Sequence, residues 1–237
     1  MRHTFVLVHG AWHGGWCWRR VADRLRAAKH VVHTPTLTGL GERSHLLAPG
    51  VGLSTHIADI VNVIAWEELD DIVLCGHSYG GMVIAGVAER AFDKIRSIVF
   101  LDAFLARNGD ALIDLVPPAG QQAMREHLNA GDTTLAPRSA EAFGVNEADR
   151  AWVDRLCVPQ PAAAMTEKIV LTGAYERIAR KTYIRAAGYP NPAFDAAYAR
   201  VRADASWRTD EIGCGHDVMV DRPEWLSDRL IAAAEGA

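Results

Sequence analysis

Residues 76–80 read Gly76-His77-Ser78-Tyr79-Gly80, a G-x-S-x-G pattern that stands between a short apolar run and a helical run. The apolar run, residues 71–75, predicts a short buried strand, and residues 81–90 predict a helix. A serine on a tight strand-to-helix turn has a strained backbone that directs its Oγ away from the sheet. Side chains at the two flanking glycines would collide across such a turn. The pattern therefore favours Ser78 as a nucleophile over an incidental serine in a glycine-rich turn.

The composition of the chain is that of an ordinary globular enzyme. Its 237 residues suit one large domain, or one domain that carries an insertion. Hydrophobic residues make up 49%, charged residues 23%, and the formal net charge is −4. The acidic balance and the lack of a Lys/Arg-rich run argue against a nucleic-acid binder. No apolar stretch has the length of a membrane span, so we expect neither a nucleic-acid nor a membrane partner.

Two features of the sequence predict a cytoplasmic location. The first residues run directly into a strand-like stretch, residues 5–8, which leaves no room for a signal peptide. The four cysteines (Cys17, Cys75, Cys157 and Cys214) form no C-x-x-C pair, which favours reduced thiols over disulfides or a zinc site. The sequence also contains neither an H-E-x-x-H pair nor a G-x-x-x-x-G-K-[ST] loop. We therefore expect no metal and no cofactor.

Strand-like and helical stretches alternate along the first hundred residues. This alternation predicts an α/β fold with a mostly parallel central sheet flanked by helices. Ser54 is a plausible N-cap of one of the helices. The predicted strands are 4–8, 31–34, 71–75 and 97–102, and the predicted helices are 16–28, 54–66 and 81–90.

The pattern changes after the strand that ends at Asp102. Between Phe104 and Ile178, prolines punctuate short helical pieces and no clear strand is present. We interpret residues 104–178 as a helical cap inserted into a core that consists of residues 1–103 and 179–237. Strand character returns at 181–185 and 207–212, and a final helix is predicted for 223–234.

A serine hydroxyl needs a base that takes its proton. On a G-x-S-x-G turn the order along the chain is serine, acid, histidine, with the histidine on a loop after the last strand. Among the ten histidines, His216 alone has that position, in the loop Gly213-Cys214-Gly215-His216-Asp217 before the final helix. We therefore predict His216 as the base.

An oxyanion hole needs two N–H donors near the developing charge. One donor is expected to be the backbone N–H of Tyr79, directly after the nucleophile. The other is expected from the loop after the first strand, at Ala11.

These motifs resemble a known family. Residues 5–16 with 76–81 look like the α/β-hydrolase branch of the plant methylesterases and hydroxynitrile lyases and their bacterial esterase relatives. The loop 37–43 and the Gly215-His216 ending extend the resemblance over most of the chain. It implies a cofactor-free hydrolase with a pocket for a small ester between sheet and cap.

The lyases of this branch differ from this sequence at two positions. They carry a threonine in the first loop and a lysine directly after the catalytic histidine, where this chain has Gly10 and Asp217. An anionic Asp217 would repel cyanide. The sequence therefore argues against cyanohydrin chemistry.

The acid has two candidates. In the plant relatives it follows the strand that corresponds to residues 181–185, but here that strand runs into Ala-Ala-Gly-Tyr-Pro without a carboxylate. Asp195 lies further on and would reach the histidine only if its loop folds back. Asp102 ends the strand after the nucleophile helix, at the sheet edge where the carboxyl ends of parallel strands open. A buried aspartate needs a partner such as a histidine N–H, so geometry favours Asp102, and Asp195 is the alternative.

The sequence thus predicts a serine esterase for a small, largely apolar carboxylic ester, with Gly10, Trp12 and His13 as candidate pocket residues. A ligand-binding protein on a hydrolase scaffold is one alternative. A C–C bond hydrolase or lyase with the same triad is another. The physiological substrate and the oligomeric state stay open, with a homodimer as one option.

Overall fold

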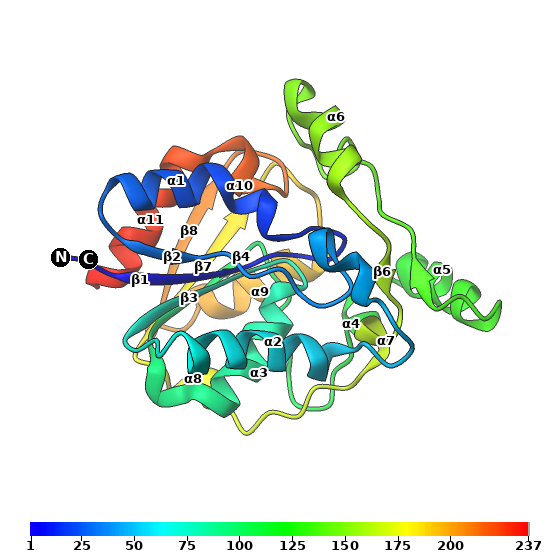
Figure 1. Ribbon diagram of the computed structural model, residues 1–237, viewed down its shortest axis with the longest axis horizontal. Coiled ribbons are helices and arrows are strands. Elements are labelled where there is room, and N and C mark those ends of the chain that lie inside the picture. The colour runs from blue at the N-terminus through cyan, green and yellow to red at the C-terminus, as the bar shows by residue number, and fades with distance from the viewer. Residues whose placement is uncertain (237) are drawn as a thin grey trace.

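A six-stranded parallel sheet forms the centre of the molecule (Figure 1), and the computed structural model describes residues 1–236. The strand order is β2-β1-β3-β4-β7-β8. The inner strands are almost entirely buried because helices cover both faces of the sheet. The strands are β1 (Thr4–Val8), β2 (Val31–His33), β3 (Ile72–His77), β4 (Ile95–Leu101), β7 (Arg180–Ala186) and β8 (Trp207–Ile212).

Helices cover the sheet in two layers, as Figure 1 shows. One layer contains α1 (Arg19–Ala27), α10 (Val218–Asp221) and α11 (Pro223–Glu235). The other contains α2 (Leu53–Trp66), α3 (Gly80–Ala91) and α8 (Ala174–Arg177). The predicted parallel sheet flanked by helices is therefore confirmed. No helix of the described chain is long and apolar enough to cross a bilayer.

Two helix starts differ from the prediction. The first helix is preceded by a separate 3-10 turn, Gly15–Trp18. Helix α2 begins at Leu53 with Gly52 as N-cap, so the assignment of Ser54 as N-cap is wrong. The Ser54 N–H instead donates to the carboxylate of Glu167, at 3.0 Å, which supplies the acceptor that an N-cap side chain would have provided.

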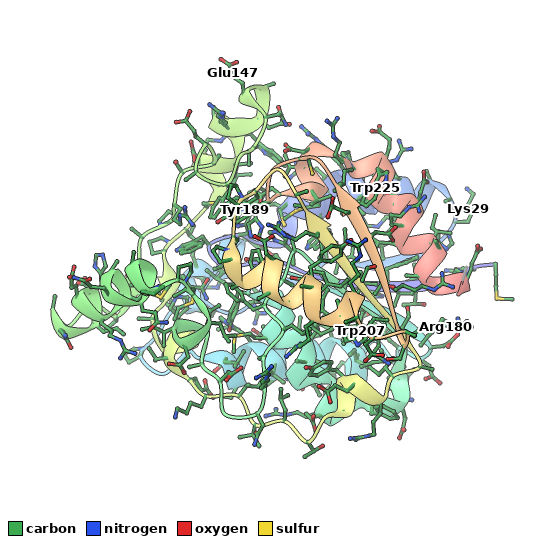
Figure 2. The ribbon with its side chains drawn as sticks, turned by 180° about the vertical axis from the view of Figure 1, so that it is seen from behind. Lys29, Glu147, Arg180, Tyr189, Trp207 and Trp225 are labelled. Atoms are coloured by element: carbon green, nitrogen blue, oxygen red, sulfur yellow. The ribbon has the colours of Figure 1, made fainter. Side chains whose placement is uncertain are left out.

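Between β4 and β7 the chain forms several short helices. We call residues 104–178 the cap segment. It includes α4 (Leu112–Leu115), α5 (Pro118–Asn129), α6 (Glu147–Leu156) and α7 (Ala163–Thr166). Helices α5 and α6 project from the core, and Glu147 marks the outer end of α6 in Figure 2. The expectation that this segment lacks strands is wrong, because β5 (Thr134–Leu135) pairs antiparallel with β6 (Gln160–Pro161).

The residues after β7 form a helix and not the expected loop. Helix α9 (Pro192–Arg202) starts with a proline in its first turn, and the Asn191 side chain accepts from the Ala193 N–H at 3.0 Å. Asp195 therefore lies in the first turn of α9. Because all six strands are parallel, their carboxyl ends share one edge of the sheet, where Ser78 and Asp102 follow β3 and β4.

Candidate active site

Ser78 lies on the sharp turn between β3 and α3. Its φ is +55°, a conformation that costs free energy for a residue other than glycine. The turn packs so closely on β1 that a Cβ at position 80 would lie 2.8 Å from the carbonyl oxygens of Val8 and His9. A Cβ at Gly76 would collide with the Gly80 carbonyl oxygen. Both flanking glycines are thus required by the geometry of the turn.

His216 is hydrogen-bonded to Asp102. The distance from His216 Nδ1 to Asp102 Oδ2 is 2.6 Å, and the Asp102 side chain is fully buried. Because Nδ1–H donates to the carboxylate, Nε2 is left as the basic nitrogen. Asp102 Oδ1 accepts two further hydrogen bonds, from Arg185 Nη1 at 2.7 Å and from the Ala186 N–H at 3.0 Å.

Asp195, the alternative acid, instead binds Arg185. Its Oδ1 lies 2.9 Å from Arg185 Nε and 2.8 Å from Nη2, and its side chain is 62% exposed. Arg185 therefore stands between the two carboxylates. Burial opposes its charge, but Asp102 and Asp195 raise the pKa of Arg185 above its ordinary value. No sequence pattern singles out Arg185, because β7 also carries the charged residues Arg180 and Lys181.

Aromatic rings and a second histidine enclose His216. The Tyr189 ring stacks on the imidazole with 4.6 Å between centroids, and Tyr189 lies between the end of β7 and the start of α9 (Figure 2). The Phe194 ring stacks at 5.4 Å. The backbone N–H of His216 donates to the Phe143 carbonyl at 2.8 Å. The backbone carbonyl of His216 accepts a hydrogen bond from His77 Nε2–H at 3.0 Å. Burial keeps the pKa of His77 well below its ordinary value, so this donor is a neutral imidazole.

The two predicted oxyanion donors, Ala11 and Tyr79, line the same cavity as Ser78 and His216. Neither backbone N–H donates a hydrogen bond to another group of residues 1–236. Free N–H groups beside a nucleophile are the arrangement that stabilises an oxyanion. The Tyr79 hydroxyl is turned away and donates to Nδ1 of His56 on α2, at 2.8 Å.

The His9 ring fixes the loop that carries Ala11 through two hydrogen bonds. His9 Nε2 accepts from the Leu37 N–H at 3.1 Å, so its Nδ1 carries the proton and donates to the Gly10 carbonyl at 2.8 Å. Burial lowers the pKa of His9 to about 3, which keeps the ring neutral.

Trp12 ties this loop to the cap segment. Its φ is +65°, its N–H donates to Gln160 Oε1 at 3.0 Å, and its indole N–H donates to the Leu135 carbonyl at 3.1 Å. The strained conformation is thus supported by two hydrogen bonds to β5 and β6.

A cavity of about 480 Å³ lies between the sheet edge and the cap segment. Trp12 lines it, whereas Gly10 and His13 do not. Gly10 packs behind the nucleophile, where an added Cβ would lie 2.9 Å from both Ser78 Cβ and His77 Nδ1, so the threonine of the lyases has no room there. The apolar lining comprises Phe104, Leu112, Val116, Met124, Leu135, Phe143, Met165 and Phe194, and polar side chains are contributed by His127, Arg138 and Asn191.

His13 and Asp217 form a buried ion pair beside this cavity. His13 Nε2 lies 3.0 Å from Asp217 Oδ2, and Asp217 does not line the cavity. Burial opposes the charge of His13, but the Asp217 carboxylate raises the pKa of His13 well above its ordinary value. Burial likewise opposes the Asp217 charge, and His13 holds the pKa of Asp217 below its ordinary range. The argument that Asp217 repels an anion in the pocket is therefore wrong, because a cation balances this charge outside the pocket.

No group of three or more His, Cys, Asp or Glu side chains in residues 1–236 could hold a metal ion. The convergent polar groups are those of a serine, a histidine and an aspartate with two free N–H donors. Such an arrangement can carry out acyl transfer.

Comparison with known proteins identifies the family of the chain. The model of the alpha/beta hydrolase family matches residues 5–229. The chain belongs to the alpha/beta hydrolase family. This hydrolase is 45% identical over 238 residues to a carbendazim hydrolyzing esterase from Nocardioides sp. (strain SG-4G), with 97% of the chain and 98% of the relative covered. It is 26% identical to esterase PIR7B of Oryza sativa subsp. japonica, with 97% and 95% covered.

The solved structures include a similar bacterial protein. An extracellular alpha/beta-hydrolase from Paenibacillus species, described as sharing structural and functional homology with tobacco Salicylic Acid Binding Protein 2, superposes with a TM-score of 0.85. It is 26% identical, and 98% of each chain is covered. The Arabidopsis methylesterase MES16, at 20% identity and a TM-score of 0.74, shows the shared fold. The resemblance to plant methylesterases and bacterial esterases is confirmed, and the hydrolase is an enzyme of the ester-hydrolase class.

Proposed function

We propose that this hydrolase cleaves a small, largely apolar carboxylic ester through an acyl-enzyme on Ser78, with His216 as general base and Asp102 as the acid. The observation that carries the proposal is the 2.6 Å hydrogen bond from His216 Nδ1 to Asp102, in a site whose His216 lines the same cavity as Ser78. A binding protein needs none of these groups in this arrangement.

In the proposed reaction, Ser78 Oγ attacks the ester carbonyl carbon while His216 Nε2 takes the hydroxyl proton. The N–H groups of Ala11 and Tyr79 stabilise the oxyanion, a contribution of about 3–4 kcal/mol per donor. The C–O bond then breaks, and His216 gives its proton to the leaving alkoxide. Water, deprotonated by His216, hydrolyses the acyl-enzyme and restores Ser78. Asp102 orients the imidazole and stabilises its cation throughout.

The cavity supports the proposed substrate class. Its volume of about 480 Å³ and its mainly apolar lining suit an acyl or aryl group of modest size. The bacterial relative is named for the hydrolysis of carbendazim. Carbendazim is therefore a substrate to test beside p-nitrophenyl acetate and butyrate.

The test compares steady-state hydrolysis of these compounds by wild type, Ser78→Ala and Ser54→Ala. Ser54 is an exposed serine at the start of α2 and is the matched control. We expect Ser78→Ala to lose roughly 10⁴-fold or more in kcat, because the nucleophile is gone, and Ser54→Ala to match wild type. A serine-directed fluorophosphonate should label wild type once, on Ser78, as read by mass spectrometry.

Each of the other outcomes would point to a different function for this chain. Ester turnover that survives in Ser78→Ala would assign the chemistry to another residue. A wild type that neither turns over esters nor reacts with the fluorophosphonate would be a binding protein. Labelling of Ser78 without ester turnover would favour a C–C bond hydrolase or lyase.

A further inference from the structure

The contacts of His13 define its protonation state. Nδ1 lies 2.8 Å from the Ala11 carbonyl oxygen and Nε2 lies 3.0 Å from Asp217 Oδ2. Both partners are acceptors, and a neutral imidazole has only one N–H. The two hydrogen bonds therefore require a His13 imidazolium, which is paired with an Asp217 carboxylate.

The pair is enclosed on all sides. The side chains of His13 and Asp217 are 2% and 0% exposed. The Trp16 ring stacks on His13 with 5.3 Å between centroids, and Cys157 Sγ lies 3.9 Å from its Nε2. His77 also lies near the pair, with its Nε2 3.9 Å from Asp217 Oδ1. The charge of Asp217 interacts with Cys17 and with His216 as well. Removal of one member of a buried pair is costly because the partner's charge is left without compensation.

The pair joins two loops that are separated by 204 positions in the chain. His13 holds the carbonyl of Ala11, whose N–H is the proposed oxyanion donor, and Asp217 directly follows His216, the proposed base. We propose that the His13–Asp217 ion pair is a positioning element. It fixes the loop after β1, which carries Ala11, relative to the loop after β8, which carries His216. This inference rests on the proposed function, since it assigns the pair a role in that reaction. The pair itself does not touch the substrate.

Asp217→Leu is the sharpest variant, because the leucine side chain is close to that of aspartate in shape and can neither donate nor accept a hydrogen bond. Without the carboxylate, His13 in its buried position becomes neutral and keeps one N–H, which can still donate to the Ala11 carbonyl. The hydrogen bond between positions 13 and 217 is lost, and the two loops are no longer tied. We expect kcat for p-nitrophenyl butyrate to fall about 10–100-fold with KM within about threefold, since misplacement of reacting groups by about 1 Å costs on that order. The rate constant for fluorophosphonate labelling of Ser78 should fall by a similar factor.

Asp71→Asn is the control. It removes an ion pair with Arg96 at the opposite edge of the sheet, and asparagine tolerates the positive φ of Asp71. We expect kcat and the labelling rate of this variant to match wild type. If Asp217→Leu has a lower Tm but wild-type kcat and labelling rate at 25 °C, the pair is merely structural and the inference is wrong. Wild type that fails to label would instead refute the proposed function.

A second measurement uses wild type alone and decides the question if Asp217→Leu does not fold. In ¹⁵N-histidine-labelled protein at pH 8, both ring N–H groups of His13 should be observed, assigned through their contacts with the Trp16 ring. A His13 with a single ring N–H at this pH would overturn the ion pair and the proposal with it.

Discussion

At the residue scale, the two aspartates near His216 have different surroundings. Asp102 is fully buried, and both of its oxygens are hydrogen-bonded, Oδ2 to His216 and Oδ1 to Arg185 and the Ala186 N–H. Complete pairing of this kind offsets the cost of taking a carboxylate out of water. Asp195 is largely exposed and contacts Arg185 only from the outer side. We therefore expect only Asp102 to act on the imidazole.

Asparagine at each position tests this difference. Asp102→Asn keeps the shape but favours the wrong tautomer of His216, and we expect a fall in kcat of roughly 10⁴-fold. Asp195→Asn should stay within about threefold of wild type, since Arg185 still binds Asp102. Hydrolysis of p-nitrophenyl butyrate at pH 7.5 measures both. Equal losses in the two variants would contradict the assignment.

A functional residue can be predicted from sequence when the residues next to it in the chain form a recognisable pattern. Ser78 lies in a recognisable motif, His216 follows a predicted strand, and Asp102 ends one at the expected sheet edge. Arg185 has no local signal, because its partner Asp102 is 83 positions away. The contact between His13 and Asp217 likewise arises only when distant loops meet. Side-chain pairing over such separations depends on tertiary structure that a local pattern does not contain.

At the element scale, the start of α2 depends on the cap segment. The Glu167 carboxylate accepts from the Ser54 N–H in the first turn of the helix. A negative charge at this position satisfies a free N–H and interacts favourably with the helix dipole. No local rule could predict this cap, because Glu167 lies 113 positions away.

Glu167→Ala removes this contact. We expect the free energy of unfolding to fall by about 1 kcal/mol, the usual effect of losing a cap, while kcat changes less than about threefold. Urea unfolding followed by circular dichroism, with Glu126→Ala on the exposed last turn of α5 as control, measures the change. An unchanged unfolding midpoint would show that water replaces the carboxylate without loss.

Helix α5 offers a test of how the cap segment limits substrate size. The helix has no fully buried residue, and Ala123 and Met124 on it line the cavity. Ala123→Trp should fill part of the cavity without disturbing the sheet. We expect kcat/KM for p-nitrophenyl octanoate to fall at least about tenfold, because the long acyl chain would lose apolar contacts with the cavity wall. The kcat/KM for the acetate should change little. Equal losses for both esters would place the bulky acyl chain elsewhere.

The elements themselves were largely predictable, because apolar periodicity is a local property. The predicted strands overlap β1, β2, β3, β4, β7 and β8, and the main shifts are at their ends. Helix α9 was missed because its prolines suggested a loop, whereas one of them occupies a first helical turn. Strands β5 and β6 are two residues each and depend on their pairing.

At the scale of the whole molecule, buried neutral histidines make stability depend on pH. Burial lowers the pKa of His9 to about 3 and also lowers the pKa values of His56 and His77. In the unfolded chain these groups titrate near 6.5. As the pH falls below 6.5, the unfolded state binds protons that the folded state does not, so the free energy of unfolding decreases.

For His9 alone, this decrease between pH 7 and pH 5 is about 2 kcal/mol. His56 and His77 act in the same direction. His13 acts in the opposite one, because its raised pKa contributes stability that is fully present below pH 6.5. We expect urea unfolding to give a free energy at least about 2 kcal/mol lower at pH 5 than at pH 7. Equal stability at the two pH values would show that these histidines are charged in the folded protein.

The pairing of β4 with β7 has a consequence for how the enzyme reaches its active form. These neighbours in the middle of the sheet are separated in the chain by the whole cap segment, and Asp102 meets a histidine 114 positions further on. Contacts over such separations form late, because the intervening chain must first be brought to order. A refolding chain should regain helix signal and the β1–β3–β4 half of the sheet before it can turn over any ester. Catalytic activity is thus the natural reporter of the last step of folding.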